Sequence, residues 1–546
     1  MTRLLVGPVL RYVGTTDATV WVETDEPCEV SVTVGGATHA DRTWTVAGHH
    51  YALVIVDGLA AGSSAPYEVR LDGTTAWPAP GSTRPASQIR TLSDHRPLRL
   101  AFGSCRYGRA AMMRGDRHFA PDALACYARD LARLPVDDPG RPDAILMLGD
   151  QVYADETSEA TRRRIRARRD ITTGAEDQVA DFEEYTWLYL ESWTDPDVRW
   201  LMSTVPSSMI FDDHDVRDDW NTSHAWRVEM QRTDWWQERI VGGLMSYWVY
   251  QHLGNLTPDA LRADELFQRV RAHDGPTDEL LRAFATRADA EADGAKGARW
   301  SYRRDFGRTR MIMIDSRCGR ILAGGERSMV SRDEFAWLES QVDGDYDHLL
   351  IGTSLPWLLT RALHDLEAWD EVLCDGSHPR LARFGEWLRR AADLEHWAAF
   401  GDSFEWLTEL VGRVGSGPAA PATVCVLSGD VHHAYIAEAH YPRPLGSRVF
   451  QLTCSPLHNY VPAMMKVLFR VFWSRLMERF FRVLLGVVAE VPVPSVRWTR
   501  SVGPLFRNEL AEFVADGRSA VTLLRQPASS SDDSGLTELT RLRLSG

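Results

Sequence analysis

Cysteine is scarce and scattered in this sequence of 546 residues. The seven cysteines are odd in number and include no C-x-x-C pair, so neither a disulfide framework nor a zinc ribbon is indicated, and we expect reduced thiols. The amino terminus has no apolar run long enough for a signal peptide, no small-residue cleavage site and no twin arginine. These features predict a cytoplasmic location.

Basic residues are fewer than acidic residues. The formal net charge is -15 at pH 7, from 61 Lys and Arg against 76 Asp and Glu. A phosphate backbone would be repelled over most of such a surface, which argues against nucleic-acid binding by bulk electrostatics and leaves room only for a local basic pocket. The apolar and charged fractions, 44% and 25%, are those of an ordinary globular protein, and the length favours two to four domains.

No apolar run is both long enough and free enough of charge to span a bilayer. The most apolar segment, 461–489, is interrupted by Lys466, Arg470, Arg475, Glu478, Arg479 and Arg482. An amphipathic helix of this kind could lie on a membrane surface or in a dimer interface. It could instead pack across the large domain with its arginines reaching toward water, which is the preferred interpretation.

Two kinds of sequence follow one another along the chain. Residues 1–95 contain short alternating runs rich in Val and Thr, separated by turn residues, which predicts an all-β sandwich. The segment 58–71 resembles fibronectin type III or immunoglobulin-like modules, with Tyr67 in the place of their corner tyrosine. Residues 96–546 alternate buried apolar strands with amphipathic segments, which predicts an α/β or layered α+β domain. Residues 157–300 are expected to form a mostly helical insertion in it.

Polar residues follow the apolar strands of this second domain. The run 144–148 has the length and composition of a strand buried on both faces, and Gly149 permits a sharp turn after which Asp150 and Tyr153 project together. A carboxylate and a phenol suit a hard cation, whereas Asp150 could equally cap the following helix. The other strands are expected at 98–103, 208–211, 310–315, 348–354 and 423–430.

Four segments bring metal-ligand types to the ends of such strands. They are F-G-S-C-R (102–106), L-G-D-Q-V-Y (148–153), F-D-D-H-D (211–215) and S-G-D-V-H-H (428–433). Carboxyl ends of parallel strands meet at one edge of a sheet, so distant segments can converge there. Taken singly, each has an ordinary explanation: a capped turn, a small buried cysteine or a satisfied core histidine. Their coincidence in one structural context favours a metal centre.

In this order the four segments resemble the alkaline phosphatase D (PhoD-like) family of metallophosphatases, in the calcineurin-like metallophosphoesterase superfamily. That family carries Ser-Cys, Gly-Asp-x-x-Tyr, Asp-Asp-His-Glu and Ser-Gly-Asp-Val-His elements behind an amino-terminal β-sandwich. I-D-S-R (314–317) and V-G-P-L-F-R-N-E-L (502–510) extend the resemblance over nearly the whole chain. The resemblance implies a catalytic domain of two β-sheets flanked by helices.

The resemblance also implies which residues bind metal. Fe³⁺ would be bound by Cys105, Tyr153 and His432, a second metal, commonly Ca²⁺, by Asp213 and Asp430, and both by a bridging Asp150. Thiolate, phenolate and imidazole suit iron, whereas carboxylates suit calcium. Two cations about 3.5–4 Å apart would hold both the attacking hydroxide and the phosphoryl oxygens.

Two further roles and three departures follow from the same comparison. His214 would protonate the leaving group, and Arg317 would bind the substrate. Asp218 and Asp219 stand where the family usually has asparagines, and Asp215 shortens the family's glutamate by one methylene. A histidine of the wider superfamily, expected before Pro356, is replaced by serine two residues earlier.

The function implied is metal-dependent hydrolysis of phosphomonoesters, phosphodiesters or both. Two alternatives stay open. One is a catalytically weak metallophosphatase fold that acts as an interaction or membrane-surface protein. The other keeps the metals for different chemistry, such as phosphoanhydride hydrolysis or a redox use of iron. The expected partner is a phosphate-ester substrate, and contact with a membrane surface is not favoured.

Overall fold

The first nine strands form the predicted all-β region. A computed structural model describes residues 1–108, 119–375, 378–531 and 533–546. One sheet has the order β1-β2-β6-β5 and the other β4-β3-β7-β8, with β9 on β7. Their bounds are β1 (Leu4–Val13), β2 (Ala18–Thr24), β3 (Glu29–Val34), β4 (Ala37–Arg42), β5 (Trp44–Val46), β6 (His49–Val56), β7 (Ser64–Leu71), β8 (Thr74–Trp77) and β9 (Gln88–Arg90). A Val-rich core lies between the two sheets.

Tyr67 differs from a corner tyrosine. A corner tyrosine bonds to its own domain's backbone a few residues upstream. The hydroxyl of Tyr67 instead donates to the carbonyl of Ser203, 2.6 Å away, on helix α4 (Pro196–Thr204). This residue therefore ties the sandwich to the rest of the chain.

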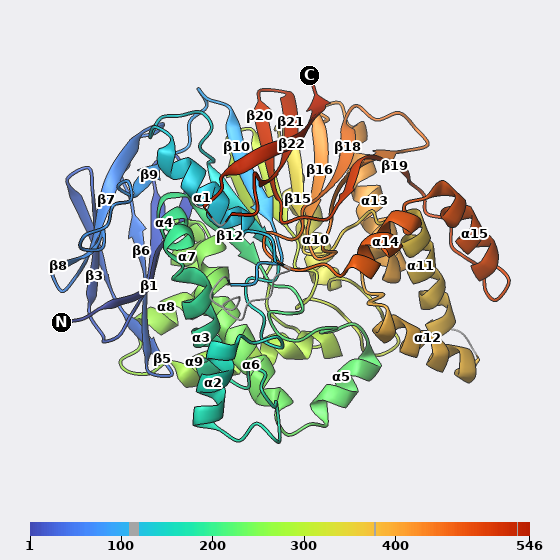
Figure 1. Ribbon diagram of the computed structural model, residues 1–546, viewed down its shortest axis with the longest axis horizontal. Coiled ribbons are helices and arrows are strands. Elements are labelled where there is room, and N and C mark those ends of the chain that lie inside the picture. The colour runs from blue at the N-terminus through green and yellow to red at the C-terminus, as the bar shows by residue number, and fades with distance from the viewer. Residues whose placement is uncertain (109–118, 376–377, 532) are drawn as a thin grey trace.

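Two larger sheets form the centre of the molecule (Figure 1). Their orders are β12-β11-β10-β20-β21-β22 and β13-β14-β15-β16-β18-β17-β19. Their bounds are β10 (Leu98–Gly103), β11 (Ala144–Leu148), β12 (Ser207–Ile210), β13 (Tyr302–Phe306), β14 (Thr309–Met313), β15 (His348–Gly352), β16 (Thr423–Ser428), β17 (Ala434–His440), β18 (Arg448–Thr453), β19 (Arg497–Leu505), β20 (Leu510–Asp516), β21 (Ser519–Pro527) and β22 (Leu536–Ser545). The six strands expected in this domain are all present.

The sheets face each other and helices cover their outer faces. In β11, Ala144, Leu146 and Leu148 join the core between the sheets, while Ile145 and Met147 join the core beneath the helices. The helices on that side include α1 (Ala123–Arg133), α3 (Phe182–Trp193) and α6 (Trp236–Ser246); those on the seven-stranded side include α10 (Arg332–Gln341) and α13 (Gly401–Ser416). The expected mixed α/β fold of two sheets flanked by helices is thus observed.

The region 157–300 is mostly helical, but it also contains β12, an edge strand of the six-stranded sheet. Its helices are α2 (Glu159–Arg168), α3, α4, α5 (His224–Gln231), α6, α7 (Pro258–Ala263), α8 (Glu265–Ala272) and α9 (Asp278–Asp289). Strand β12 lies between α4 and α5 and pairs in parallel with β11. The region therefore contributes a strand to the six-stranded sheet and is not a separate helical insertion.

The parallel strands bring their carboxyl ends to one edge of each sheet. β10, β11 and β12 run parallel in one sheet, and β14, β15, β16 and β18 do so in the other. The four polar segments identified in the sequence follow β10, β11, β12 and β16. The topology thus places them where ligand sites of such sheets assemble.

The apolar segment 461–489 forms two helices instead of one. They are α14 (Ala463–Phe472) and α15 (Arg475–Leu485), separated at Trp473 and Ser474. One face packs on the large domain: the Phe469 ring lies 4.6 Å from that of His433, and the Trp473 ring 4.9 Å from that of Tyr435. In the described part of the chain, no helix is long and apolar enough to cross a membrane.

His49 joins the sandwich to helix α3. Its Nδ1 lies 2.8 Å from Oε1 of Glu23 and its Nε2 2.9 Å from Oε2 of Glu183. Burial alone would lower the pKa of His49, but the hydrogen bonds to Glu183 and Glu23 outweigh it and raise the pKa to about 9. The histidine is therefore charged at neutral pH.

We expect His49 to make stability depend on pH. Because its folded pKa is raised from 6.5 to about 9, its contribution of about 3 kcal/mol is complete below pH 6.5 and is lost as pH rises through about 9. Urea unfolding of the wild type and His49→Gln should show a large difference at pH 6 and a small one near pH 10. His95→Gln, at an exposed position, is the control. An equal difference at both pH values would contradict this linkage.

Candidate metal centre

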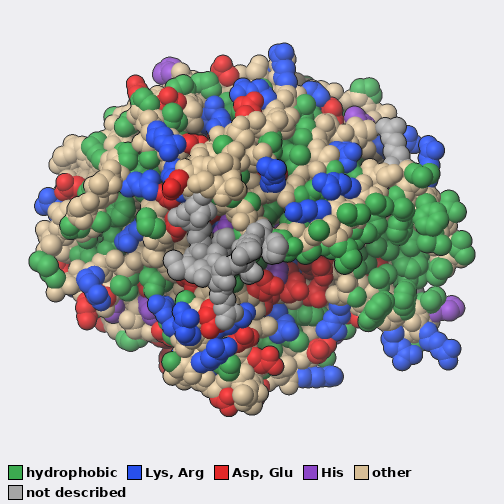
Figure 2. Space-filling model, viewed as in Figure 1, with side chains coloured by type: hydrophobic (Ala, Val, Ile, Leu, Met, Phe, Trp, Pro, Cys, Tyr) green, Lys and Arg blue, Asp and Glu red, His purple; other side chains and the backbone are tan. Residues whose placement is uncertain are grey.

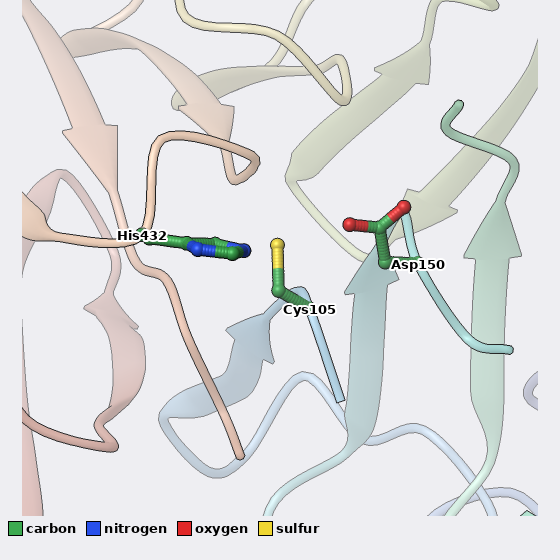
Figure 3. A group of neighbouring side chains, drawn as sticks. All are labelled: Cys105, Asp150 and His432. Atoms are coloured by element: carbon green, nitrogen blue, oxygen red, sulfur yellow. The ribbon is translucent and has the colours of Figure 1, made fainter. Parts of the chain in front are cut away.

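Three residues from distant parts of the chain meet at the edge of the sheets. The ligand atoms of Cys105, Asp150 and His432 all lie within 4.8 Å of one another. Figure 3 shows the Cys105 sulfur between the His432 ring and the Asp150 carboxylate. The hydroxyl of Tyr153 lies 3.5 Å from Oδ2 of Asp150. The structure thus brings together the four residues that the sequence analysis assigned to iron.

A second group shares one of these residues. The ligand atoms of Asp150, Asp212 and Asp213 also lie within 4.8 Å of one another. Asp430, the other predicted ligand of the second metal, is in neither group of described residues. It lies nearby, since Arg317 contacts both Asp213, at 3.2 Å, and Asp430, at 3.8 Å. Asp150 belongs to both groups, which is the position a bridging ligand requires.

Some carboxylate oxygens of this centre receive no hydrogen bond from the described part of the chain. Among the described residues, Oδ1 of Asp150 and Oδ2 of Asp212 are buried without a hydrogen-bond partner. Burial raises the pKa of Asp150 well above its ordinary value, and the charges of Asp212 and Asp213 raise it further although His214 opposes them. Such crowding of buried carboxylates is unfavourable unless cations balance it. The residues therefore fit a site for two cations.

The remaining ligand types also fit. Burial, with the charge of His214, lowers the pKa of His432 to about 4, so its imidazole is neutral, the form that binds metals. Burial also raises the pKa of the Cys105 thiol well above its ordinary value. A coordinated cation reverses that effect, because it stabilises the thiolate.

The backbone is bent into uncommon conformations at the ligands. Cys105, Asp150, Asp430 and His432 have φ values of 54°, 49°, 67° and 49°, in the left-handed region that costs a non-glycine residue on the order of 1 kcal/mol. Gly149 has φ 108°, and a Cβ there would lie 2.7 Å from Cβ of Asp212. The glycine therefore permits both the turn and the close approach of the two acidic loops.

Asp215 holds two of these loops together. Its Oδ2 accepts from the backbone N–H groups of Asp150 at 3.1 Å and Asp212 at 2.9 Å, and its Oδ1 from those of Gln151 at 3.1 Å and Val152 at 3.2 Å. One carboxylate thus fixes the turn after β11 against the turn after β12. The shorter aspartate is long enough for this position.

His214 lies beside the second group of carboxylates. Its Nδ1 is 3.0 Å from Oδ2 of Asp155, and its side chain is 18% exposed. Burial would lower the pKa of His214, but Asp155 and Asp213 raise it well above its ordinary value. His214 also has ligand atoms within 4.8 Å of those of Asp213 and Asp218. The geometry thus offers two roles, proton donor or metal ligand.

Arg317 lies beneath the carboxylates and has no exposed side-chain surface. Its Nε donates to Asp212 at 2.6 Å, and its two terminal nitrogens donate to Glu395 at 2.5 and 2.6 Å. Every nitrogen of the guanidinium therefore already has a carboxylate partner. Substrate binding by Arg317 remains a prediction, and this arrangement favours a positioning role.

Sequence reasoning gave no role to three residues of the site. Asp212 directly precedes the predicted ligand Asp213, so the doubled aspartate was a usable signal. Asn459 follows β18 and donates to the Tyr153 hydroxyl at 2.8 Å, so strand-end polarity could have indicated it. His396 lies in a loop after α12 (Pro379–Ala391), joining Asp430 at 3.0 Å to Glu367 at 2.6 Å. No local pattern marks it.

Comparisons with known proteins find PhoD-like relatives of this chain. A family model described as a PhoD-like phosphatase matches residues 122–272, and one described as a domain of unknown function (DUF7800) matches residues 1–89. A solved structure of PhoD is similar in fold, with a TM-score of 0.59 and 10% identity, over 99% of this chain and 90% of that chain. No curated protein sequence matches significantly. The resemblance identified in the sequence is confirmed, and the family match supports a phosphatase.

Proposed function

We propose that this protein, which contains a PhoD-like phosphatase domain, hydrolyses phosphomonoesters, phosphodiesters or both with two bound metal ions. The observation that carries the proposal is that Asp150 lies within ligand distance of two groups, Cys105 with His432 and Asp212 with Asp213. Sulfur, nitrogen and oxygen donors on one side favour Fe³⁺, and oxygen donors alone on the other favour Ca²⁺. Bound there, the cations would supply charge that activates water and holds phosphoryl oxygens.

The protein's own residues would keep these ligands in place. Asp215 fixes the loops that carry Asp150 and Asp212 through four backbone hydrogen bonds. His396 holds Oδ2 of Asp430, and the other oxygen of Asp430 lies 3.8 Å from Arg317. Partners of this kind orient ligands, and their loss typically weakens metal binding about 10–100-fold.

His214 is the proposed proton donor to the leaving oxygen. Asp155 accepts from its Nδ1, which orients the ring and leaves Nε2 3.9 Å from Oδ1 of Asp218. A proton held at Nε2 would stabilise the alkoxide that forms when the ester bond breaks.

We expect His214→Ala to keep both metals and to slow hydrolysis of alkyl esters by roughly 10²–10⁴-fold. Aryl esters with good leaving groups should lose much less, since their leaving oxygen needs no proton. Rates on matched alkyl and aryl phosphates, together with metal content, measure this. Asp155→Asn, which retains the ring but disturbs its orientation, should show a smaller loss of the same kind. Loss of metal from His214→Ala would identify the histidine as a ligand instead.

Metal analysis of the purified protein, combined with a substrate panel, tests the proposal as a whole. The panel holds an aryl phosphomonoester, an aryl phosphodiester and pyrophosphate. We expect ester turnover with iron bound. Active protein with zinc alone would reject iron binding by Cys105 and Tyr153, and turnover of pyrophosphate alone would assign the site to phosphoanhydrides.

A reducing compartment, the cytoplasm, is part of the proposal. All seven cysteines are free of disulfide bonds in the described structure. Cys105 must stay reduced to act as a ligand, and reduced thiols persist in the cytosol.

A further inference from the structure

Helices α14 and α15 expose a large apolar surface, here called the outer face. It consists of side chains of α14, of α15 and of the turn after α15 that are 37% to 79% exposed: Met464, Val467, Leu468, Val471, Leu476, Phe480, Val483, Leu484, Val487 and Val488. Figure 2 shows hydrophobic side chains gathered over these two helices, at the opposite end of the molecule from the sandwich. Contiguous apolar patches of this kind mark interaction sites on soluble proteins.

The two helices are held firmly from beneath. Leu485 is 7% exposed and packs with Trp369 and Leu373 of helix α11 (Arg361–Asp375). Arg482 donates to Asp365 of the same helix at 3.0 Å. The packed and exposed residues alternate with helical spacing, so each helix is amphipathic and presents one apolar face outward. The outer face is therefore a fixed surface of the folded protein.

The charge of the helix pair is opposite to that of the whole chain. Residues 463–485 contain five basic residues and one acidic residue, although the whole chain carries a net charge of -15. Arg482 is turned inward to Asp365, and Glu478 lies 3.8 Å from Arg361. Arg470 and Arg479 are exposed, and Lys466 is half-buried. Cations thus accompany the outer face on both helices.

We propose that the outer face docks on an anionic membrane surface, with α14 and α15 lying in the plane of the interface. An apolar face accompanied by Lys and Arg is the pattern of interfacial helices. With 10 and 11 residues the helices are about half the length needed to span a bilayer. Pairing with a second copy through a two-fold axis would bring the cations of the two copies together. The observations therefore favour the membrane.

Docking would also bring the metal centre close to the lipid surface. Asn459, which donates to the Tyr153 hydroxyl, lies four residues before the first residue of α14. The Phe469 ring packs on His433, next to the ligand His432. The same short stretch of chain therefore connects the site to the proposed membrane contact.

Vesicle sedimentation of the full chain tests the proposal independently of catalysis. The probes are vesicles of phosphatidylcholine and vesicles of phosphatidylcholine with phosphatidylglycerol. The wild type should sediment with the anionic vesicles, and less so as salt is raised. A triple variant, Leu476→Glu, Val483→Glu and Val487→Glu, should bind them at least about tenfold more weakly. Arg479→Glu should weaken binding about fivefold or more.

Matched variants separate docking from folding. Phe384→Glu with Trp387→Glu replaces exposed apolar side chains on α12 and should leave sedimentation unchanged. The melting temperature and turnover of a soluble aryl phosphate should stay unchanged in all variants, because their side chains are exposed and lie outside the metal centre. The proposal would be overturned if the wild type sedimented with neither kind of vesicle. It would also be overturned if the triple variant sedimented with the anionic vesicles as well as the wild type does. Conversion of a dimer to a monomer by the triple variant, measured by light scattering, would assign the outer face to a second copy.

Discussion

Asp150→Asn is expected to abolish turnover and to release both metal ions from the purified protein. The carboxylate of Asp150 is the one shared by the Cys105 group and the Asp212 group, so its loss removes a ligand from each. An outer partner of a metal ligand is worth about 10–100-fold in affinity, and a shared ligand should exceed that. Metal content and ester hydrolysis, measured on the same samples, report the effect.

Two control variants show whether the effect of Asp150→Asn is specific to a shared ligand. Asp143→Asn, which replaces a buried aspartate just before β11 that pairs with Arg96 at 2.6 Å, should retain both metals and activity. Tyr153→Phe should remove visible tyrosinate-to-iron absorption and leave the calcium content nearly unchanged. If Asp150→Asn kept one metal in full, Asp150 would serve a single site and the bridging role would be wrong.

Arg317→Met is expected to destabilise the protein by about 3–5 kcal/mol, because it leaves buried charges without a counter-charge. The guanidinium contacts Asp212 and Glu395 at 2.5 to 2.6 Å and Asp213 at 3.2 Å. Arg317→Lys should recover only part of the loss, since an ammonium cannot serve several carboxylates in the fork geometry of arginine. Chemical unfolding in the presence of a chelator measures the effect on the fold alone.

A surface arginine provides the comparison. Arg308 also pairs with two aspartates, Asp345 and Asp347, but its side chain is 54% exposed. Arg308→Met should therefore cost no more than about 1 kcal/mol. If Arg317→Met kept wild-type stability and raised only the KM for substrate, Arg317 would be a substrate-binding residue, as the family resemblance implied.

Local sequence patterns were sufficient to locate the strands and most of the candidate ligands. The run 144–148 is apolar at every position because alternate side chains enter two different cores. Gly149 then ends the strand, and the polar residue that follows must lie at the sheet edge. The same logic places Cys105, Asp213 and His432. A short-range pattern carries this information because parallel strands share one direction.

Residues that contact the site from distant parts of the chain could not be recognised from a local sequence pattern. His396 reaches Asp430 from a loop between helices, and nothing in its neighbourhood distinguishes it from a surface histidine. Arg317 was correctly placed after a strand, but its burial depends on Glu395, which the sequence does not connect to it. The break between α14 and α15 was also missed, because the apolar pattern continues across Trp473 and Ser474.

The first sheet of the sandwich is buried on both sides. Trp21 and Tyr51 point away from the sandwich interior and belong to the same core as Trp193 and Tyr250. Arg11 of β1 has no exposed surface and donates to the carbonyls of Tyr250 and Gln251. The sandwich therefore shares a hydrophobic core with the rest of the chain, and we expect the two to unfold together. Cutting the chain after residue 95 would expose this shared apolar surface on both fragments. We expect both fragments to aggregate instead of folding independently.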